Sequence, residues 1–420
     1  MRLRTTLLKY ASINAMVPVS TLAVTIILAR ILSTREYGIY TLCVTAATTV
    51  AAIACQWLVQ SVARFLPTAK NSSDAEMIRA TAVTTAVLYI SVCGLISIVG
   101  FSLTSLSIWF EYIAVASLLA GVLVLYSTLT SIYQADMNPS AYAVLTGCSL
   151  IVKSTVVVIV AVCFKSAVST VLGAAIAGLI AVMFSVSRSL PSTVPQYLSV
   201  SRATIRKSLF RYGFPMTGWF IASNLLAVSD RYLIGAFFSP SEVGIYSSNY
   251  ALASAGVSLV TAPVALTMYP ALMREWSSGR ADEARHMIRK IVFMLSAFGL
   301  LGTGCLVFLS HWFSLLVLGP RLADGYSIIP IVFLASVILQ IGTYLHKPFE
   351  FEHRTRALFL CMSFAAATNV ILNCILLRPC GYSVAAWTTL AGAVAYCVAV
   401  LLGRSASSKA PELCKGALET

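Results

Sequence analysis

Apolar stretches long enough to cross a membrane follow one another along almost the whole chain. About 20 helical residues span the hydrocarbon core, which is about 30 Å thick. Of the 420 residues, 59% are hydrophobic and only 10% are charged, whereas soluble domains carry about 25% charged residues. The apolar runs are continuous, unlike the alternating strands of a β-barrel. We therefore predict an all-α polytopic membrane protein. The twelve expected spans are 10–32, 39–61, 80–102, 108–133, 141–164, 167–187, 213–237, 244–271, 289–310, 326–345, 356–377 and 383–402.

The basic residues gather in alternate loops. With the N-terminus in the cytoplasm, 22 of the 29 Lys and Arg residues fall on the cytoplasmic side and five on the other side. This bias predicts that both termini are cytoplasmic. It also accounts for the net charge of +14 without nucleic-acid binding, because these loops lie beside anionic headgroups. We expect no cleaved signal peptide, since the first apolar stretch leads directly into further spans.

A short pattern occurs twice. Residues 32–40 (LSTREYGIY) return at 238–246 (FSPSEVGIY), 206 positions later, with the shared order Ser-x-x-Glu-x-Gly-Ile-Tyr. A weaker echo relates residues 8–10 to 210–212. Six spans separate the copies, so the halves are expected to be parallel repeats with one orientation. Within each copy, the Ser and Glu have the spacing of a helix capping box, and the Gly allows close approach of backbones.

The repeat divides the chain into domains. The expected domains are an N-terminal six-helix bundle over 1–187, a basic cytoplasmic linker over 188–212, a C-terminal six-helix bundle over 213–403 and a cytoplasmic tail over 404–420. Residues 200–209 have the composition of a short amphipathic surface helix. The segment 310–325 is expected either to extend the ninth span or to form an interfacial piece.

Two segments carry a resemblance to a known family. Residues 29–33 with 36–40, and residues 229–235 with 242–247, resemble bacterial polysaccharide-biosynthesis membrane proteins, the Wzx-type O-antigen flippases. That family shares a superfamily with multidrug and toxic-compound extruders (MATE) and lipid II flippases. The resemblance implies a MATE-like fold of two pseudo-symmetric six-helix bundles.

The resemblance also implies a function. It implies translocation of undecaprenyl-pyrophosphate-linked oligosaccharide units across the bacterial inner membrane, by alternating access, for O-antigen, capsule or exopolysaccharide synthesis. Expected partners are this lipid-linked substrate, bilayer lipids, a polysaccharide polymerase and a chain-length regulator. No bond changes in such transport, so we expect no enzyme activity, catalytic residue, metal or cofactor. The chain contains no Gly-x-x-x-x-Gly-Lys-Ser/Thr pattern for nucleotide binding.

Cationic and aromatic residues within the spans are candidates for substrate binding, because a charge in the bilayer is costly. They are Arg30, Lys153, Arg231 and Trp219. Lys153 lies mid-span, where it would face a diphosphate or else bond neighbouring carbonyl or hydroxyl groups. Arg30 lies near a span end, and snorkelling to the headgroups is the alternative. Trp219 would stack on a sugar or belong to the interfacial aromatic belt.

Four further residues are candidates for coupling or gating: Asp230, Glu111, Pro18 and Pro215. Asp230 would bind a coupling proton or sodium ion, or form an ion pair that locks the outward gate. Glu111 is equally consistent with an interfacial position. Pro18 and Pro215 each remove a backbone hydrogen bond in the first helix of a half, where bending would open the cavity, although prolines also occur in static spans.

Three alternative functions follow from the same residues. A MATE-like exporter of small molecules or drugs would carry a smaller and often acidic site, whereas the charges within the spans here lean basic. Lipid II flippases usually exceed twelve spans. A membrane glycosyltransferase or polymerase needs acid–base carboxylates in a loop, and the stretch 188–211 holds no Asp or Glu.

Overall fold

The computed structural model describes residues 2–69, 72–189, 203–352 and 354–408, and no strand occurs among them. The first group of helices is α1 (Arg2–Ile31), α2 (Thr34–Phe65), α3 (Ser72–Ser102), α4 (Ile108–Ala135), α5 (Pro139–Phe164) and α6 (Ala167–Ser189). The second group is α7 (Ala203–Phe237), α8 (Pro240–Ser277), α9 (Ala281–Leu318), the 3₁₀ helix η2 (Ala323–Ile328), α10 (Ile329–Leu345), α11 (Lys347–Phe351), α12 (Thr355–Cys380) and α13 (Val384–Ser408). The predicted all-α class is confirmed.

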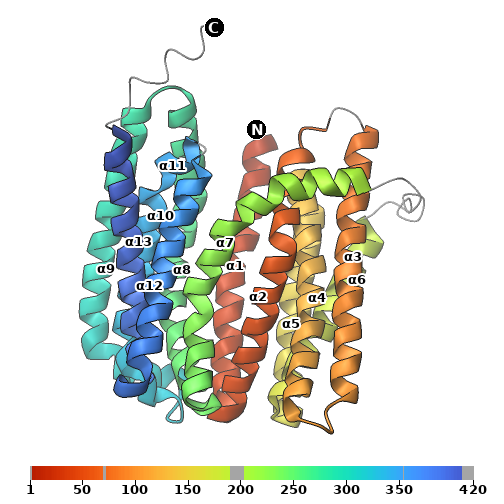
Figure 1. Ribbon diagram of the computed structural model, residues 1–420, viewed down its shortest axis with the longest axis vertical. Coiled ribbons are helices and arrows are strands. Elements are labelled where there is room, and N and C mark those ends of the chain that lie inside the picture. The colour runs from red at the N-terminus through yellow and green to blue at the C-terminus, as the bar shows by residue number, and fades with distance from the viewer. Residues whose placement is uncertain (1, 70–71, 190–202, 353, 409–420) are drawn as a thin grey trace.

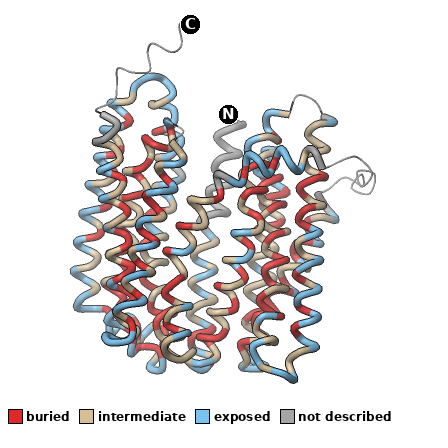
Figure 2. Tube along the Cα trace, viewed as in Figure 1, coloured by how far each residue is buried: buried red, intermediate tan, exposed pale blue. Residues whose placement is uncertain are grey.

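The helices form two bundles that stand side by side. In Figure 1, α2–α6 lie on one side and α8–α13 on the other, with α1 and α7 between them. We call the end where α6 and α13 finish the linker end. The opposite end, where α1 turns into α2 and α7 into α8, is the repeat end. Figure 2 shows buried residues along the inner faces of the helices and exposed residues along the outer faces of α3 and α9.

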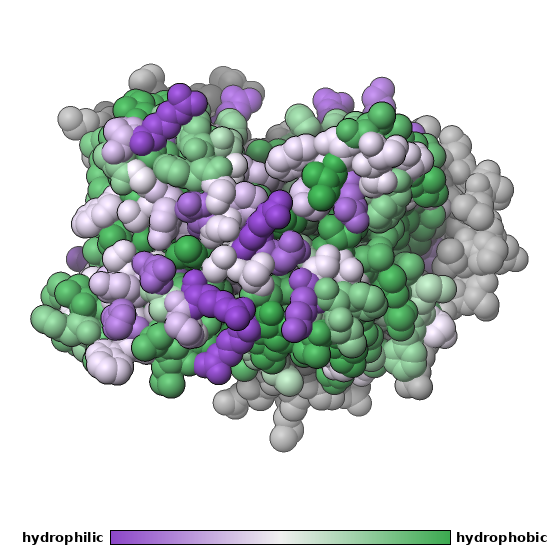
Figure 3. All heavy atoms as spheres, turned by 90° about the horizontal axis from the view of Figure 1, so that it is seen from below, coloured by the Kyte–Doolittle hydropathy of each residue, from purple (hydrophilic) through white to green (hydrophobic). Residues whose placement is uncertain are grey.

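The outer faces are apolar, as lipid-facing surfaces must be. On α9, Phe293, Leu300 and Phe308 are 75%, 75% and 81% exposed. Figure 3, a view of the repeat end, shows hydrophilic side chains over the middle and the second bundle, and hydrophobic ones over much of the first. In the described part of the chain, ten helical stretches are long and apolar enough to cross a membrane. The other two expected spans correspond to α1 and α7, so the chain is a multi-pass membrane protein.

The structure shows the form of two segments for which the sequence left alternatives open, 310–325 and the described part of 200–209. The ninth span continues to Leu318, and the separate piece that follows is η2. Residues 203–209 are helical as expected, but they are the first turns of α7 and not a separate helix. The hydroxyl of Ser61 in α2 donates to the carbonyl of Leu209 at 2.6 Å, which fixes the start of α7 against the first bundle. The remainder of the expected linker, 190–202, and the tail after 408 lie outside the described residues.

The two copies of the repeat pack against each other at the repeat end. A Cβ atom at Gly38 would lie 1.7 Å from the carbonyl oxygen of Pro240, and one at Gly244 would lie 2.2 Å from that of Thr34. The first turns of α2 and α8 are therefore in reciprocal backbone contact, with the glycine of each copy facing the opposite helix. The close approach predicted for these glycines is confirmed, and it occurs between the bundles.

The capping boxes differ between the copies. In the second copy the capping box is complete. The Ser239 hydroxyl accepts from the backbone of the first turn of α8, and the Glu242 carboxylate accepts from the Ser239 amide at 3.2 Å. In the first copy, the Ser33 hydroxyl accepts from the Glu36 amide at 3.2 Å. The Glu36 carboxylate instead accepts from the amide of Ala167 at 2.7 Å, at the start of α6. Glu36 thus connects α2 to α6. The prediction of a complete capping box in the first copy is therefore wrong.

Adding one methyl group at Gly38 or Gly244 is expected to destabilise the contact between the bundles. Gly38→Ala and Gly244→Ala each force the backbones apart, with an expected loss of about 1–3 kcal/mol. Gly256→Ala on α8 is the matched control, because no atom lies within 4 Å of its added Cβ. Thermal unfolding of the purified proteins checks this. Equal midpoints for Gly244→Ala and Gly256→Ala would contradict it.

Candidate functional site

Asp230 is the centre of a fully buried polar cluster in the second bundle. Its side chain is 1% exposed. One carboxylate oxygen accepts from the Tyr246 hydroxyl at 2.7 Å and the Thr389 hydroxyl at 2.5 Å. The other accepts from the amide groups of Asn373 at 2.7 Å and Asn369 at 3.1 Å. Four donors from three other helices satisfy a carboxylate that would otherwise be very costly at this depth.

A second layer of hydrogen bonds fixes these donors. The Ser229 hydroxyl donates to the side-chain oxygen of Asn369 at 2.8 Å, and the Thr388 hydroxyl donates to that of Asn373 at 2.7 Å. The cluster therefore joins α7, α8, α12 and α13 through side chains alone. An outward-gate ion pair was one expectation for Asp230, but all of its hydrogen-bond donors among the described residues are neutral. Its chemistry instead suits a site where a proton or a small cation changes the hydrogen-bond pattern.

Among the described residues, the position of the first bundle equivalent to Asp230 is apolar. At the repeat offset of 206 residues, Tyr246 corresponds to Tyr40, but Asp230 corresponds to Val24. Both Val24 and Tyr40 pack against the hydrophobic core. Sequence reasoning identified Asp230 and missed Tyr246, Asn369 and the other donors. The spacing of Asn369 and Asn373, four positions apart in an apolar span, is the signal that they share one helix face.

Arg231 forms no hydrogen bond to this cluster among the described residues. Its guanidinium donates to the carbonyl of Ala227 at 2.8 Å and lies 4.8 Å from the ring centre of Tyr250 on α8. Its Nε atom is buried and has no hydrogen-bond acceptor among the described residues. A backbone carbonyl and an aromatic face thus hold this charge in place.

Lys153 is half-buried in the middle of α5. No described residue lies within hydrogen-bond or ion-pair distance of its ammonium group. The neighbouring Ser154 bonds to Ser20 of α1 at 3.0 Å between the hydroxyl oxygens. Lys153 therefore lies beside the α1–α5 contact with its charge unpaired, so the carbonyl or hydroxyl bonds expected as the alternative are not formed.

Arg30 joins the two bundles at the repeat end. Its Nε donates to the carbonyl of Val317 at 3.0 Å, and its terminal nitrogen donates to that of Leu316. These are among the last carbonyls of α9, which have no partner within the helix, and a cation is favourable there. The side chain of Arg30 thus caps α9 and does not snorkel freely. Arg30, Lys153 and Arg231 lie on three different helices, α1, α5 and α7.

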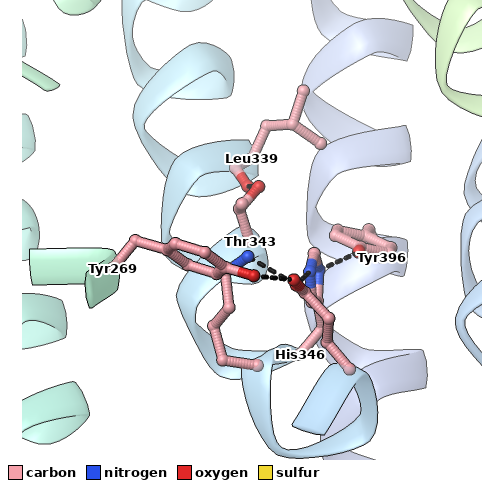
Figure 4. Close-up of polar contacts among 7 residues, drawn as sticks. Tyr269, Leu339, Thr343, His346 and Tyr396 are labelled. Atoms are coloured by element: carbon pink, nitrogen blue, oxygen red, sulfur yellow. Dashed lines mark hydrogen bonds and ion pairs between the residues drawn. The ribbon is translucent and has the colours of Figure 1, made fainter. Parts of the chain in front are cut away.

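Trp219 packs against a second polar network near the linker end, whose members Tyr269, His346 and Tyr396 are labelled in Figure 4. Its ring is half-buried and lies edge-on to the His346 ring at 5.8 Å. The Nδ1 atom of His346 lies 2.6 Å from the Tyr396 hydroxyl, which joins α13 to the end of α10. Trp219 packs in the second bundle beside this histidine. Its ring is therefore partly covered by protein and is not a free surface on which a sugar could stack.

The same network reaches α8 through a carboxylate. Glu350 accepts from the Tyr269 hydroxyl at 2.7 Å and from the Lys347 ammonium at 2.5 Å. Lys347 also lies 4.6 Å from the centre of the Tyr269 ring. Sequence reasoning missed this group, because its residues come from three separate segments. It supplies a cation and two hydroxyl groups near the linker end of the second bundle.

Glu111 lies half-buried in the first turn of α4, where the helix dipole stabilises a carboxylate. Its neighbours Trp109 and Tyr112 line an apolar hollow of about 580 Å³ that also includes Leu42 of α2 and Tyr232 of α7. The hollow therefore lies between the bundles. Glu111 itself does not line it, which agrees with the interfacial alternative.

The predicted hinge prolines occupy the first helix of each half. Pro18 lies inside α1. Pro215 falls within α7, but its side chain lies outside the described residues. A third helix, α8, contains Pro263 and Pro270. Within the described part of the chain, no group of three or more His, Cys, Asp or Glu side chains is arranged to hold a metal ion.

Comparison with known proteins gives a family and a fold. The sequence pattern of the family described as "Polysaccharide biosynthesis protein" matches residues 7–276. No curated protein matches in sequence. Similar solved structures include an inward-facing multidrug resistance MATE transporter of the MOP superfamily, with a TM-score of 0.67, 13% identity, and coverage of 95% of this chain and 98% of that chain. The outward-facing MATE structure gives 0.61 at 13% identity, with 97% of each chain covered.

The lipid II flippase MurJ, in an inward closed conformation, gives a TM-score of 0.66 at 14% identity, with 94% of this chain and 87% of that chain covered. At these identities the likeness shows the fold alone. The two-bundle MATE-like fold is confirmed, and the family match confirms the resemblance seen in the sequence.

Removing the Asp230 carboxylate is expected to destabilise the second bundle. Asp230→Ala leaves four buried donors without an acceptor, at about 1–3 kcal/mol for each unsatisfied group. Asp230→Asn keeps the shape and is expected to lose far less, because the Tyr246 and Thr389 hydroxyls can rotate to accept. Thermal unfolding of both variants is the measurement. An Asp230→Ala protein as stable as Asp230→Asn would contradict the assignment.

Proposed function

Because the chain belongs to the polysaccharide biosynthesis protein family, we propose that it is a flippase for undecaprenyl-pyrophosphate-linked oligosaccharides in the bacterial inner membrane. The repeat units would supply O-antigen, capsule or exopolysaccharide synthesis, with a polymerase and a chain-length regulator acting on the product. The observation that carries the proposal is the family match over residues 7–276, which includes both copies of the repeat. The fold shared with MurJ and MATE transporters is consistent with it.

The bundle contacts support alternating access. At the repeat end, Gly38 and Gly244 seat the two bundles against each other, and Arg30 binds the end of α9. The excess of basic residues at the linker end favours a cytoplasmic position for that end and for both termini. This conformation is then closed toward the periplasm, the state that receives substrate from the cytoplasmic leaflet. Release would require the contacts of Arg30 and the two glycines to separate.

Two features suit the two parts of the substrate. The unpaired ammonium of Lys153 is the described cation with the best claim to a diphosphate, since Arg30 and Arg231 already bond backbone carbonyls. The apolar hollow beside Trp109 and Tyr232, between α2, α4 and α7, suits an isoprenoid chain that stays in the bilayer.

Asp230 is the proposed coupling group. Its cluster is sealed from lipid and includes Tyr246, the last residue of the repeat. Binding a proton or sodium ion would change which hydroxyls donate to the carboxylate. Because Tyr246 lies two positions after Gly244, such a change acts on the helix that closes the repeat end.

A small-molecule exporter of the same fold is the second candidate function. The observation that keeps it open is that the inward-facing MATE structure and MurJ match this fold about equally well, with TM-scores of 0.67 and 0.66. The two candidates differ in what accumulates when the protein is absent, and one deletion strain separates them.

Deletion of the gene, in a strain without a redundant transporter, is expected to leave lipid-linked repeat units in the cytoplasmic leaflet and to remove the surface polymer. Extraction of lipid-linked oligosaccharides and staining of the polymer measure both effects. Normal surface polymer together with increased drug sensitivity would reject the flippase and favour the exporter.

Complementation of this strain tests the residues. Lys153→Ala is expected to lower polymer export about tenfold or more, since hydrogen bonds to charged groups contribute about 1.5–3 kcal/mol. Lys153→Arg should restore most of it, and Lys290→Ala on α9 is the control. Asp230→Asn should also abolish export while the protein remains folded. Full export by Lys153→Ala at equal protein level would remove that residue from the site.

A further inference from the structure

A basic cleft opens at the linker end of the second bundle, on its outer flank. Its volume is about 1110 Å³. The lining residues come from α9, the α10–α12 connection and α13. Its charged members are Arg285, Arg289, Arg354 and Arg404, with Glu352 as the acidic one. Four guanidinium groups against one carboxylate leave the cleft with a net positive charge.

These positive charges are poorly compensated within the protein. Arg285 bonds Asp282 at 3.1 Å, but the Asp282 side chain is 96% exposed, so the pair contributes little. Arg354 reaches Glu352 only at 3.6 Å. No described residue accepts a hydrogen bond from the side chain of Arg289 or Arg404. The cleft therefore holds guanidinium groups whose donors remain free for an anion.

The cleft is apolar on the membrane side of the arginines. Val292, Phe293 and Leu401 continue its walls, and Phe293 is 75% exposed. After Lys290, α9 contains no Lys, Arg, Asp or Glu through Leu318, and α13 contains none before Arg404. The arginines thus lie at the level where charge gives way to hydrocarbon, which is the level of lipid phosphates.

The cleft lies apart from the proposed transport path. In Figure 1, α9 and α13 stand at the outer edge of the second bundle, away from the first bundle. The Asp230 cluster bonds α7, α8, α12 and α13 and shares no residue with the cleft. A ligand here would contact the surrounding bilayer and would leave the seam between the bundles free.

We propose that this cleft binds an anionic phospholipid of the surrounding membrane. The phosphate lies among the guanidinium groups, whose planar donors match its oxygens. An acyl chain covers Phe293 and Leu401. Free phosphate would leave these apolar walls uncovered, and a transported lipid would need a path to the seam. The proposal does not depend on which substrate the protein moves.

Native mass spectrometry of the purified full-length protein, titrated with phosphatidylglycerol or phosphatidylcholine, tests the proposal. The double variant Arg289→Gln/Arg404→Gln is expected to bind phosphatidylglycerol about thirtyfold more weakly, since each basic residue near the surface contributes about 1 kcal/mol. Lys290→Gln/Arg356→Gln is the matched control, with the same change of charge on the same and a neighbouring helix outside the cleft. It should bind as the unaltered protein does, and phosphatidylcholine should bind all three proteins weakly.

Several outcomes would overturn the proposal. Equal losses in both double variants would mean general attraction to a basic surface. Displacement of phosphatidylglycerol by inorganic phosphate would mean a site for free phosphate, and tighter binding of undecaprenyl phosphate would mean an entry site for a transported lipid. Thermal unfolding without added lipid checks that each variant is folded. Should the double variant unfold, the single change at exposed Arg289 provides the same comparison, with an expected loss of about fivefold.

Discussion

The close approach of α2 and α8 depends on the absence of side chains at Gly38 and Gly244. Each glycine faces a first-turn carbonyl of the opposite helix, so a larger residue at either position separates the bundles. The rest of the seam follows from this contact. Arg30 reaches the end of α9 because α1 is brought beside the second bundle, and Tyr246 reaches Asp230 from the turn after Gly244. The bundle contact and the buried carboxylate are parts of one continuous structure.

The spans and the repeat could be predicted because their signals are local. Hydropathy identifies each helix that must lie in lipid, and the repeated Ser-x-x-Glu-x-Gly-Ile-Tyr marks two equivalent turns. The partners of those turns could not be predicted. Glu36 and Glu242 look alike in sequence, yet Glu36 caps α6 through Ala167 because the start of α6 lies beside it. A capping pattern describes one helix end and carries no information about a neighbouring one.

The polar sites show the same limit more strongly. Asp230 stood out as a charge inside a span, but its donors Asn369 and Asn373 lie about 140 positions away on α12. Lys153 and Arg231 were equally visible, and the structure separates them. Lys153 has no hydrogen-bond partner among the described residues, whereas Arg231 is held by a carbonyl and an aromatic ring. The sequence shows which residues have a high free-energy cost in a membrane. Only the packing of the helices shows which hydrogen bonds or ring contacts compensate that cost.

The substitution of Val24 for Asp230 at the equivalent position makes the two halves unequal. The first half has an apolar side chain at this position, whereas the second has a carboxylate held by four hydrogen-bond donors. Pseudo-symmetry in such a molecule is therefore geometrical and not energetic. Binding of a proton or cation at Asp230 would act directly on the helices of the second half, and would reach the first half through the contact at Gly38 and Gly244.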